Sequence, residues 1–415
     1  MNTIPRRLGS AITAFAIGAA GVLSFPATAS ADENRDGQWY LDALKVAEAH
    51  QVTKGEGITI GILDSGVDAT HPDLAGNVLP GTDLAGTGGD GLTPSDDHGT
   101  SVASILVGGD DTDGILGIAP AAKLISVRIT DADGEFEVGR IQEGIRWLAD
   151  NGADVISLSL FDPGAEEGGQ AAVDYAIGKN IVVVAGAGNR RGDEPNETWS
   201  AVGYPAAYRG VVAVTGTTRE GEYWDGSVEH AYGIGNWAIS APATDMRVAL
   251  RGGGYETADG TSFAAPIVAG TMALIKAKYP NLNQRQLLER LLLTADDKGT
   301  EGEDLEYGWG IVDPLAALTA DVDYYEDPAP TDDTASEAVA ATGDDGAGTG
   351  DLVPVIVSGT VLAVVVVGVL LLIRSRRRPP TPAAAPRNRP VGPPPQAAPE
   401  SWRRPPEPGP PPPAR

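Results

Sequence analysis

Short apolar runs alternate with longer helical stretches between Gly57 and Thr294, and this alternation constrains the fold more than any other feature. The runs have few polar side chains, so each strand needs cover on both faces. Such strands, separated by stretches of helical spacing, indicate βαβ units and a mostly parallel sheet in an α/β fold. The expected strands lie in the runs Gly57–Leu63, Lys123–Arg128, Val155–Leu160, Ile181–Asn189, Val211–Val214 and Trp237–Ser240, and the expected helices are Trp39–Gln51, Gly139–Asn151, Gln170–Lys179, Ser262–Lys278 and Leu282–Thr294.

The two ends of the chain predict export and a membrane anchor. Arg6 and Arg7 precede an apolar run, Ala11–Phe25, and a small-residue cleavage site ends at Ala31, as is typical of a secretory signal peptide over residues 1–31. An uncleaved N-terminal anchor is the alternative. A second apolar run, Leu352–Ile373, has no charge and is long enough to cross a bilayer. It predicts a single C-terminal transmembrane helix over residues 352–373.

The charges around this second run predict its orientation. Four arginines lie between Arg374 and Arg378, and acidic residues precede the run, so the positive-inside rule places residues 374–415 in the cytoplasm. Residues 321–351 contain ten acidic residues and no Lys or Arg, which predicts a disordered acidic stalk. The Arg- and Pro-rich tail is expected to be disordered as well. The sequence thus predicts a single-pass cell-membrane protein whose domain, residues 32–320, is extracytoplasmic.

Composition excludes several kinds of chemistry. The chain has no cysteine, so thiol catalysis and cysteine-ligated metals are excluded, and its four histidines argue against a zinc site. The formal net charge of −27 comes mainly from the exported part and argues against a nucleic-acid partner. An exported domain of this length can bury enough apolar surface to be stable without disulfides.

Four residues with catalytic potential occur in the order Asp64, His98, Asn189 and Ser262, each at the expected end of a strand or start of a helix. A serine nucleophile needs a histidine base, and the base needs a carboxylate to orient it. A side-chain amide can stabilise the oxyanion of the intermediate. For Ser262 the alternative is a serine that merely caps a helix, and for His98 it is a structural histidine. The order and the placement of all four favour a catalytic site.

These motifs resemble those of the subtilisin-like serine proteases, over about 280 residues of the chain. They are Gly61–Val67, His71–Leu74, His98–Ala103, Gly117–Pro120, Ala187–Asn189 and Gly260–Pro266. The resemblance implies a three-layer α/β/α fold and peptide-bond hydrolysis by a serine endopeptidase. It also implies that Ser262 is the nucleophile, His98 the general base and acid, and Asp64 the residue that orients the histidine.

The same resemblance implies the rest of the site. Asn189 and the backbone N–H of Ser262 would form the oxyanion hole, and Ser159 and Leu160 would pair with the substrate backbone. The stretch Gly186, Ala187 and Gly188 would line the pocket for the residue before the scissile bond. Phe161 departs from the pattern, because many relatives have glycine after the Ser-Leu pair, and it predicts a narrowed or reshaped cleft. His71 is the family's companion histidine, for which a packing role is expected.

The order of segments resembles a narrower group, the mycosins, which are membrane-anchored proteases of actinobacterial type VII secretion systems. Only 32 residues separate the expected cleavage site from Asp64, too few for a folded inhibitory prodomain. The expected partners are polypeptide substrates, the membrane and the type VII secretion machinery. A structural role in a secretion complex and a housekeeping surface protease are the alternatives. No cofactor is expected; calcium is common in subtilisins, but no compact ligand loop is evident here.

Overall fold

The computed structural model describes residues 33–324 except 87, 110–113, 132–133, 138, 166, 191–201 and 231–236. All of these residues belong to the first of two units into which the chain divides, Met1–Pro330 and Thr331–Arg415. The expected signal peptide (1–31), transmembrane helix (352–373) and cytoplasmic tail (374–415) lie outside the described residues, as does the stalk beyond Tyr324. Within the described part, no helix combines the length and the apolar character needed to cross a membrane.

In the described part of the chain, seven strands form one sheet in the order β2-β3-β1-β4-β5-β6-β7, and all neighbours are parallel. This confirms the predicted parallel α/β architecture. The strand order reverses around β1, which pairs with β3 on one side and β4 on the other. The strands are β1 (Thr59–Asp64), β2 (Val78–Asp83), β3 (Lys123–Arg128), β4 (Val155–Leu158), β5 (Val182–Gly186), β6 (Val212–Thr217) and β7 (Trp237–Pro242).

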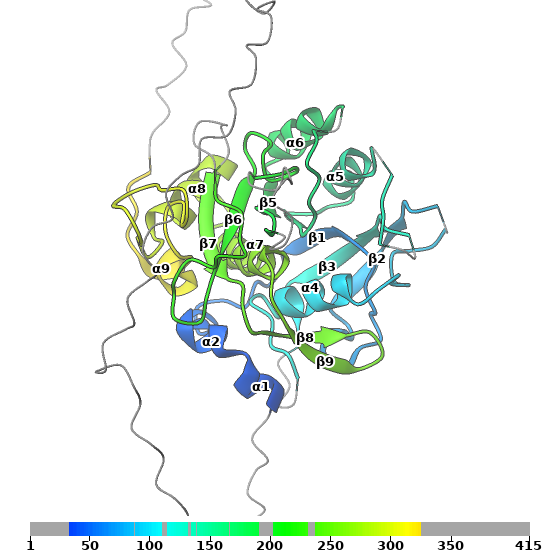
Figure 1. Cartoon of the computed structure of the whole chain (residues 1–415), viewed down its shortest axis with the longest axis horizontal. Coiled ribbons are helices and arrows are strands. Elements are labelled where there is room, and N and C mark those ends of the chain that lie inside the picture. Colours follow the sequence, from blue (N-terminus) through cyan, green and yellow to red (C-terminus); the bar gives the residue numbers. More distant parts are fainter. Residues whose placement is uncertain are drawn as a thin grey trace, which may run out of the picture. The chain divides into compact units, whose positions relative to one another are not determined.

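Helices cover both faces of this sheet (Figure 1). On one face lie α4 (His98–Val107) and α7 (Thr261–Lys278), and on the other lie α5 (Arg140–Asp150) and α6 (Gly169–Gly178). Successive strand residues point to opposite faces, so Ile62 of β1 packs in the core beneath α4 and α7, whereas Leu63 packs beneath α5 and α6. This two-sided burial explains why the strands are apolar throughout, and it makes the expected three-layer α/β/α arrangement.

The remaining elements flank the three layers. The C-terminal part of the domain contains helix α8, whose N-terminus has the capping box of Asn283 and Gln286. A two-stranded antiparallel hairpin packs over α4. These elements are α1 (Glu33–Gly37), α2 (Trp39–Ala43), α3 (Val46–Ala49), the 3-10 helix η1 (Pro72–Leu74), β8 (Met246–Leu250), β9 (Gly254–Ala258), α8 (Gln284–Leu293) and α9 (Pro314–Thr319).

The N-terminal extension differs from the single helix expected over Trp39–Gln51. It forms α2 and α3 instead, because Lys45 adopts a left-handed backbone conformation (φ 53°) and interrupts the helix. The extension is packed into the domain: the buried Gln38 amide donates to Leu116 O at 2.8 Å, and Trp39 Nε1 donates to Thr244 O at 3.1 Å. It is therefore an integral part of the domain surface.

Candidate active site

Asp64 and His98 meet at the carboxyl end of β1. Asp64 ends β1 and is 2% exposed, and its Oδ1 accepts hydrogen bonds from Ser65 N at 2.7 Å and from His98 Nδ1 at 2.8 Å. Because Nδ1 donates to the carboxylate, the neutral ring presents Nε2 as an acceptor. The His98 side chain is 35% exposed, so this nitrogen can be reached from solvent.

The close approach of α4 to β1 depends on the glycine after His98. A Cβ at Gly99 would lie 2.2 Å from Gly66 O and 3.1 Å from Asp64 Oδ1. The Gly99 N–H donates to Ser65 Oγ at 3.0 Å, which fixes the first turn of the helix beside the carboxylate. A larger residue would separate the helix from the strand and lengthen the bond between histidine and aspartate.

The electrostatics of the pair raise the pKa of His98 above its ordinary value. Removal of water from around the ring lowers this pKa, but the charge and hydrogen bond of Asp64, together with the charge of Asp96, raise it by more. Asp96 also accepts a hydrogen bond from the backbone N–H of His98 at 2.8 Å. The surroundings thus favour the imidazolium, which a histidine must become when it accepts a proton.

Ser262 lies in the first turn of α7, beside the histidine. Gly260 precedes the helix with a φ of 157°, and Ser262 is half-buried. The ring centroid of the next residue, Phe263, is 6.0 Å from that of His98. The first turn of α7, which includes Ser262, therefore lies near the His98 ring, and a helix start carries free N–H groups.

Asn189 is oriented by Thr261, a residue to which the sequence motifs assigned no role. Thr261 donates to Asn189 Oδ1 twice, from its backbone N–H at 2.9 Å and from its hydroxyl at 3.0 Å. With the amide oxygen occupied in this way, the Nδ2 group is left as the donor side of the amide. The Thr261 hydroxyl also accepts a hydrogen bond from Gly188 N at 3.2 Å, so it joins the end of β5 to the start of α7.

The other predicted site residues lie along the carboxyl ends of β4 and β5. Ser159 donates from its hydroxyl to Ser262 O at 2.8 Å, and Leu160 packs against the core beneath α5 and α6. A Cβ at Gly186 would lie 3.0 Å from Thr261 O, and Ala187 is buried. The structure therefore brings all the predicted site residues to one edge of the sheet, where ligands bind in open α/β folds.

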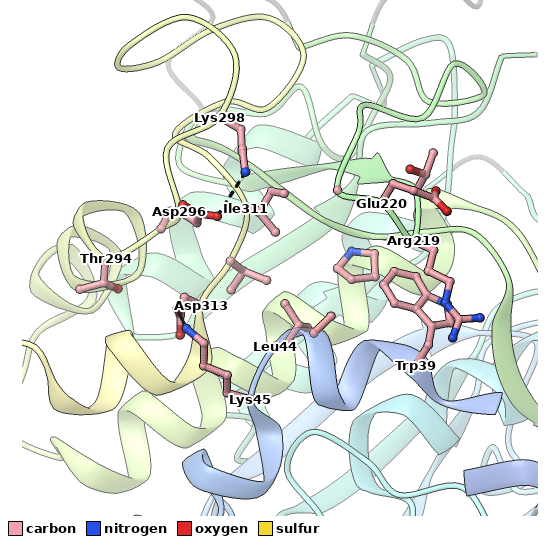
Figure 2. Close-up of a pocket in the computed structure, with 16 residues that line it drawn as sticks. Trp39, Leu44, Lys45, Arg219, Glu220, Thr294, Asp296, Lys298, Ile311 and Asp313 are labelled. Carbon is pink, nitrogen blue, oxygen red and sulfur yellow. Dashed lines mark hydrogen bonds and ion pairs between the residues drawn. The ribbon is translucent and has the colours of Figure 1, made fainter. Parts of the chain in front are cut away.

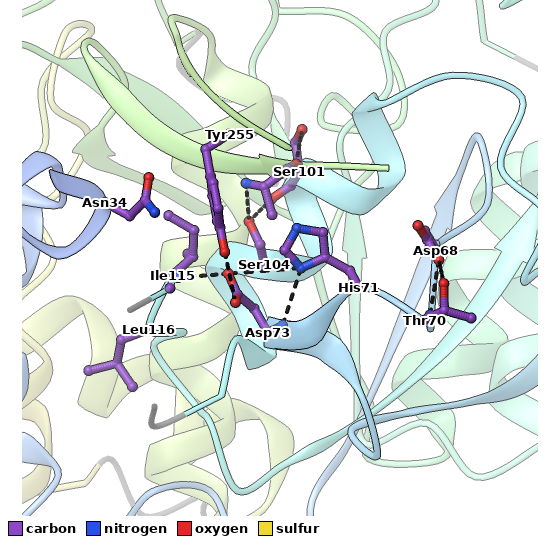
Figure 3. A network of polar contacts seen from close by, with 12 residues as sticks. Asn34, Asp68, Thr70, His71, Asp73, Ser101, Ser104, Ile115, Leu116 and Tyr255 are labelled. Carbon is purple, nitrogen blue, oxygen red and sulfur yellow. Dashed lines mark hydrogen bonds and ion pairs between the residues drawn. The ribbon is translucent and has the colours of Figure 1, made fainter. Parts of the chain in front are cut away.

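His71 belongs to a separate polar network, shown in Figure 3. It is buried, and its Nδ1 accepts a hydrogen bond from Asp73 N at 3.2 Å at the start of η1. Asp73 in turn accepts from Tyr255 Oη at 3.1 Å and from Ile115 N at 2.7 Å. These bonds join η1, the hairpin and the segment after α4, which agrees with the expected packing role.

A cavity of about 570 Å³ lies elsewhere on the domain (Figure 2). It is lined by residues such as Trp39, Leu44 and Arg219, and it includes the ion pair of Lys45 with Asp313 at 3.1 Å. None of the predicted site residues lines it. Within the described ranges, no group of three or more histidine, aspartate or glutamate side chains could hold a metal ion.

Comparison with known proteins identifies the family. Residues 55–310 match the model of the subtilase family, peptidase S8. The chain belongs to the subtilase family. This subtilase is a serine endopeptidase by family, and it is 35% identical to subtilisin DY from Bacillus licheniformis over 264 residues, covering 64% of this chain and 92% of the relative. It is 33% identical to subtilisin from Bacillus pumilus over 278 residues, covering 67% of this chain and 97% of the relative.

Solved mycosin structures are also similar to this subtilase. One is MycP1, described as a serine protease and an essential component of the type VII (ESX-1) secretion system, with a TM-score of 0.60 and 32% identity. The match covers 71% of this chain and 90% of that one. MycP1 from Mycobacterium smegmatis matches with a TM-score of 0.59 and 28% identity, over 69% of this chain and 85% of that one. The resemblance to mycosins predicted from the order of segments is thus supported by structural similarity.

Proposed function

We propose that this subtilase is a membrane-anchored serine endopeptidase that cleaves polypeptides at the outer face of the cell membrane, in association with a type VII secretion system. Asp64, His98 and Ser262 form its catalytic triad, and Asn189 completes its oxyanion hole. The observation that carries the catalytic part is the 2.8 Å bond between Asp64 and His98, beside the turn that holds the serine.

Acylation follows from the placement of the histidine. His98 Nε2 takes the proton of Ser262 Oγ as that oxygen bonds to the carbonyl carbon of the substrate. The carbon–nitrogen bond then breaks, and His98 gives its proton to the leaving amine. The Asp64 carboxylate, at 2.8 Å, stabilises the imidazolium while it holds the proton.

Deacylation repeats these steps with water. His98 takes a proton from the water as its oxygen bonds to the acyl carbon, and the proton passes to Ser262 Oγ when the ester bond breaks. In both intermediates the negative oxygen is stabilised by Asn189 Nδ2 and by the backbone N–H of Ser262. The two Thr261 bonds to Asn189 Oδ1 hold that amide before the charge develops, so no reorganisation is needed.

Sequence and similarity support the location. The uncharged run 352–373, flanked by acidic residues before it and arginines after it, supports a single-pass anchor with the protease domain outside. The likeness to MycP1 supports an association with type VII secretion. The acidic segment 321–351 would act as a tether that keeps Ser262 within reach of polypeptides emerging at the membrane.

Covalent labelling tests the catalytic assignment. A fluorophosphonate probe applied to the full chain in membranes is expected to modify one residue, and mass spectrometry of the labelled peptide is expected to place the adduct on Ser262. Prior incubation with phenylmethylsulfonyl fluoride should prevent the labelling. An adduct on another serine, or no adduct on folded protein, would contradict the assignment.

Complementation tests the association with secretion and the structural alternative. In a deletion strain, a chain with Ser262→Ala and a chain ending before Leu352 are each compared with the wild type for export of type VII substrates. Loss of export with the shortened chain and loss of substrate processing with Ser262→Ala are expected. Export that is normal in the deletion strain itself would favour a housekeeping protease. A structural role would be favoured if the chain that ends before Leu352 fails to restore export while the Ser262→Ala chain still processes all substrates.

The charge of Asp96 gives a pH prediction. In Asp96→Asn the amide oxygen can still accept the bond from His98 N, but the negative charge that raises the pKa of His98 is lost. The pKa then falls, so the acid limb of the kcat/KM–pH profile is expected to move to lower pH, because the neutral base persists to lower pH. Asp90→Asn, in the same loop, is the control and should leave the limb in place. A limb that moves to higher pH in Asp96→Asn would contradict the assignment.

A further inference from the structure

Phe161 places an aromatic ring against two glycines beside the candidate active site. A Cβ on Gly188 would lie 2.4 Å from Phe161 Cδ2, and a Cβ on Gly203 would lie 2.4 Å from Phe161 Cε2. One edge of the ring therefore spans both glycines. At each of the two positions, the side chain of any other residue would fill the space that the ring occupies. The two glycines and Phe161 therefore form one packed unit.

The backbone around the ring is fixed. Asp162 and Tyr204 exchange two backbone hydrogen bonds, each of 2.8 Å, so the segment after Phe161 pairs with the segment after Gly203. Gly203 N donates to Ala187 O at 3.4 Å, which joins the same unit to the end of β5. The half-buried ring is thus attached to one of two hydrogen-bonded segments, and it packs against the backbone of the other. A main-chain movement that carried the ring away from the two glycines would break these hydrogen bonds.

The position of this packed unit relative to Ser262 shows which part of the candidate active site the Phe161 ring occupies. Ser159, two residues before Phe161, donates to Ser262 O at 2.8 Å. Gly188 N donates to the hydroxyl of Thr261, the residue before Ser262, at 3.2 Å. The chain ends of β4 and β5 thus flank the nucleophile turn as two walls. The residue whose carbonyl is attacked carries its side chain on the Cα that is bonded to the carbonyl carbon, so that side chain must enter between these walls.

We propose that Phe161 fills the pocket for the side chain that precedes the scissile bond, so that this protease selects glycine, alanine or serine at that position. This specificity rests on the proposed catalytic site and goes beyond it. The ring is attached to one wall and lies against Gly188 of the other, so it takes the volume that a large substrate side chain would need. A substrate with phenylalanine there would have to displace the ring from its two glycines, whereas a methyl group would not.

Two peptides that differ only in alanine or phenylalanine before the scissile bond test the proposal. The full chain is used in detergent, as the wild type, Phe161→Gly, Phe161→Ala and the control Leu293→Ala, which shortens an exposed side chain on α8. Pocket-size differences of one methylene change kcat/KM by about 10–200-fold, so the wild type is expected to favour the alanine peptide by at least about 10-fold. Phe161→Gly is expected to reverse this preference, and Phe161→Ala to reduce it, while Leu293→Ala keeps it.

Fluorophosphonate labelling of each variant measures the fraction of active sites and normalises the rates. A second measurement needs no variant: the wild type should be inactivated faster by a peptidyl chloromethyl ketone ending in alanine than by one ending in phenylalanine. Equal use of both peptides and both inhibitors by the wild type would overturn the proposal and leave the catalytic site standing. A preference that is unchanged in labelled Phe161→Gly would also overturn it. Folded wild type that neither labels nor cleaves any peptide would overturn the catalytic site as well.

Discussion

Replacing Ser262 by alanine is expected to lower kcat by about 10⁶-fold, the loss seen when the serine of such a triad is removed. In the proposed mechanism Oγ is the atom that bonds to the acyl carbon, and an alanine side chain has no atom that can take its place. A residual rate about 10³–10⁴-fold above that in water should remain, because Asn189 and the backbone N–H groups still bind the oxyanion. Steady-state kinetics with a peptide of small side chains would measure the loss, and fluorophosphonate labelling should disappear with it.

The matched control is Thr319→Ala, which removes an exposed hydroxyl at the end of α9. Thr319 donates only to Leu315 O in its own helix, so kcat should equal that of the wild type. Thermal unfolding of both variants should stay close to the wild-type curve. Ser262→Ala protein that folds normally and keeps more than about a hundredth of the wild-type rate would contradict the role of Ser262, because a triad without its nucleophile cannot do so.

The central strands were predictable because burial on both faces requires apolar residues throughout. The edge strand β2 (Val78–Asp83) was missed for the opposite reason. Among the described strands it pairs only with β3, its register shifts between Leu79 and Thr82, and it contains Pro80 and Gly81. Its sequence therefore has no apolar run. Gly81 is required there by contact, because a Cβ would lie 1.9 Å from Ser126 O, and that constraint exists only once β3 is beside it.

The β8–β9 hairpin was missed although its sequence carries a signal. Met246 and Val248 are buried while Arg247 between them is half-buried, and Gly252 and Gly253, both with positive φ, form the turn. A short loop that contains glycine between two short runs indicates a hairpin. The run is only five residues long in each strand, so its stability depends on packing against α4, where Ser101 Oγ donates to Ala249 O at 2.8 Å. That contact joins residues 148 positions apart.

The candidate active site also has features that could be predicted from the sequence and features that could not. The placement of Asp64, His98, Asn189 and Ser262 at one edge of the sheet could be predicted because side-chain type and position at the ends of elements are local features. The contacts that adjust them could not, since they join distant parts of the chain. Thr261 orients Asn189 across 72 residues. The contact of Phe161 with Gly203 likewise needs the pairing of Asp162 with Tyr204, for which the sequence has no local pattern.

Replacing Asp64 by asparagine is expected to lower kcat about 10⁴-fold. The carboxylate now accepts the His98 Nδ1–H bond at 2.8 Å, whereas an amide rotated to donate to Nδ1 would favour the tautomer that carries its proton on Nε2. A protonated Nε2 cannot take the proton of Ser262. The charge and hydrogen bond of Asp64 also raise the pKa of His98, so the pKa should fall in the variant. The acid limb of the residual kcat/KM–pH profile should therefore lie at lower pH than in the wild type.

Asp154→Asn is the control for this change, because Asp154 is a carboxylate at the opposite end of the sheet. It accepts a hydrogen bond from Thr59 N at 3.0 Å, at the start of the strand that Asp64 ends, and it pairs with Lys276 at 2.9 Å. Its loss should alter stability and leave kcat unchanged. The result separates two roles of Asp64: if it acted only through its charge, Asp64→Asn would shift the pH profile and lower kcat by much less than about 10⁴-fold. If it also fixes the tautomer, as the geometry indicates, both the rate and the pKa of His98 fall together.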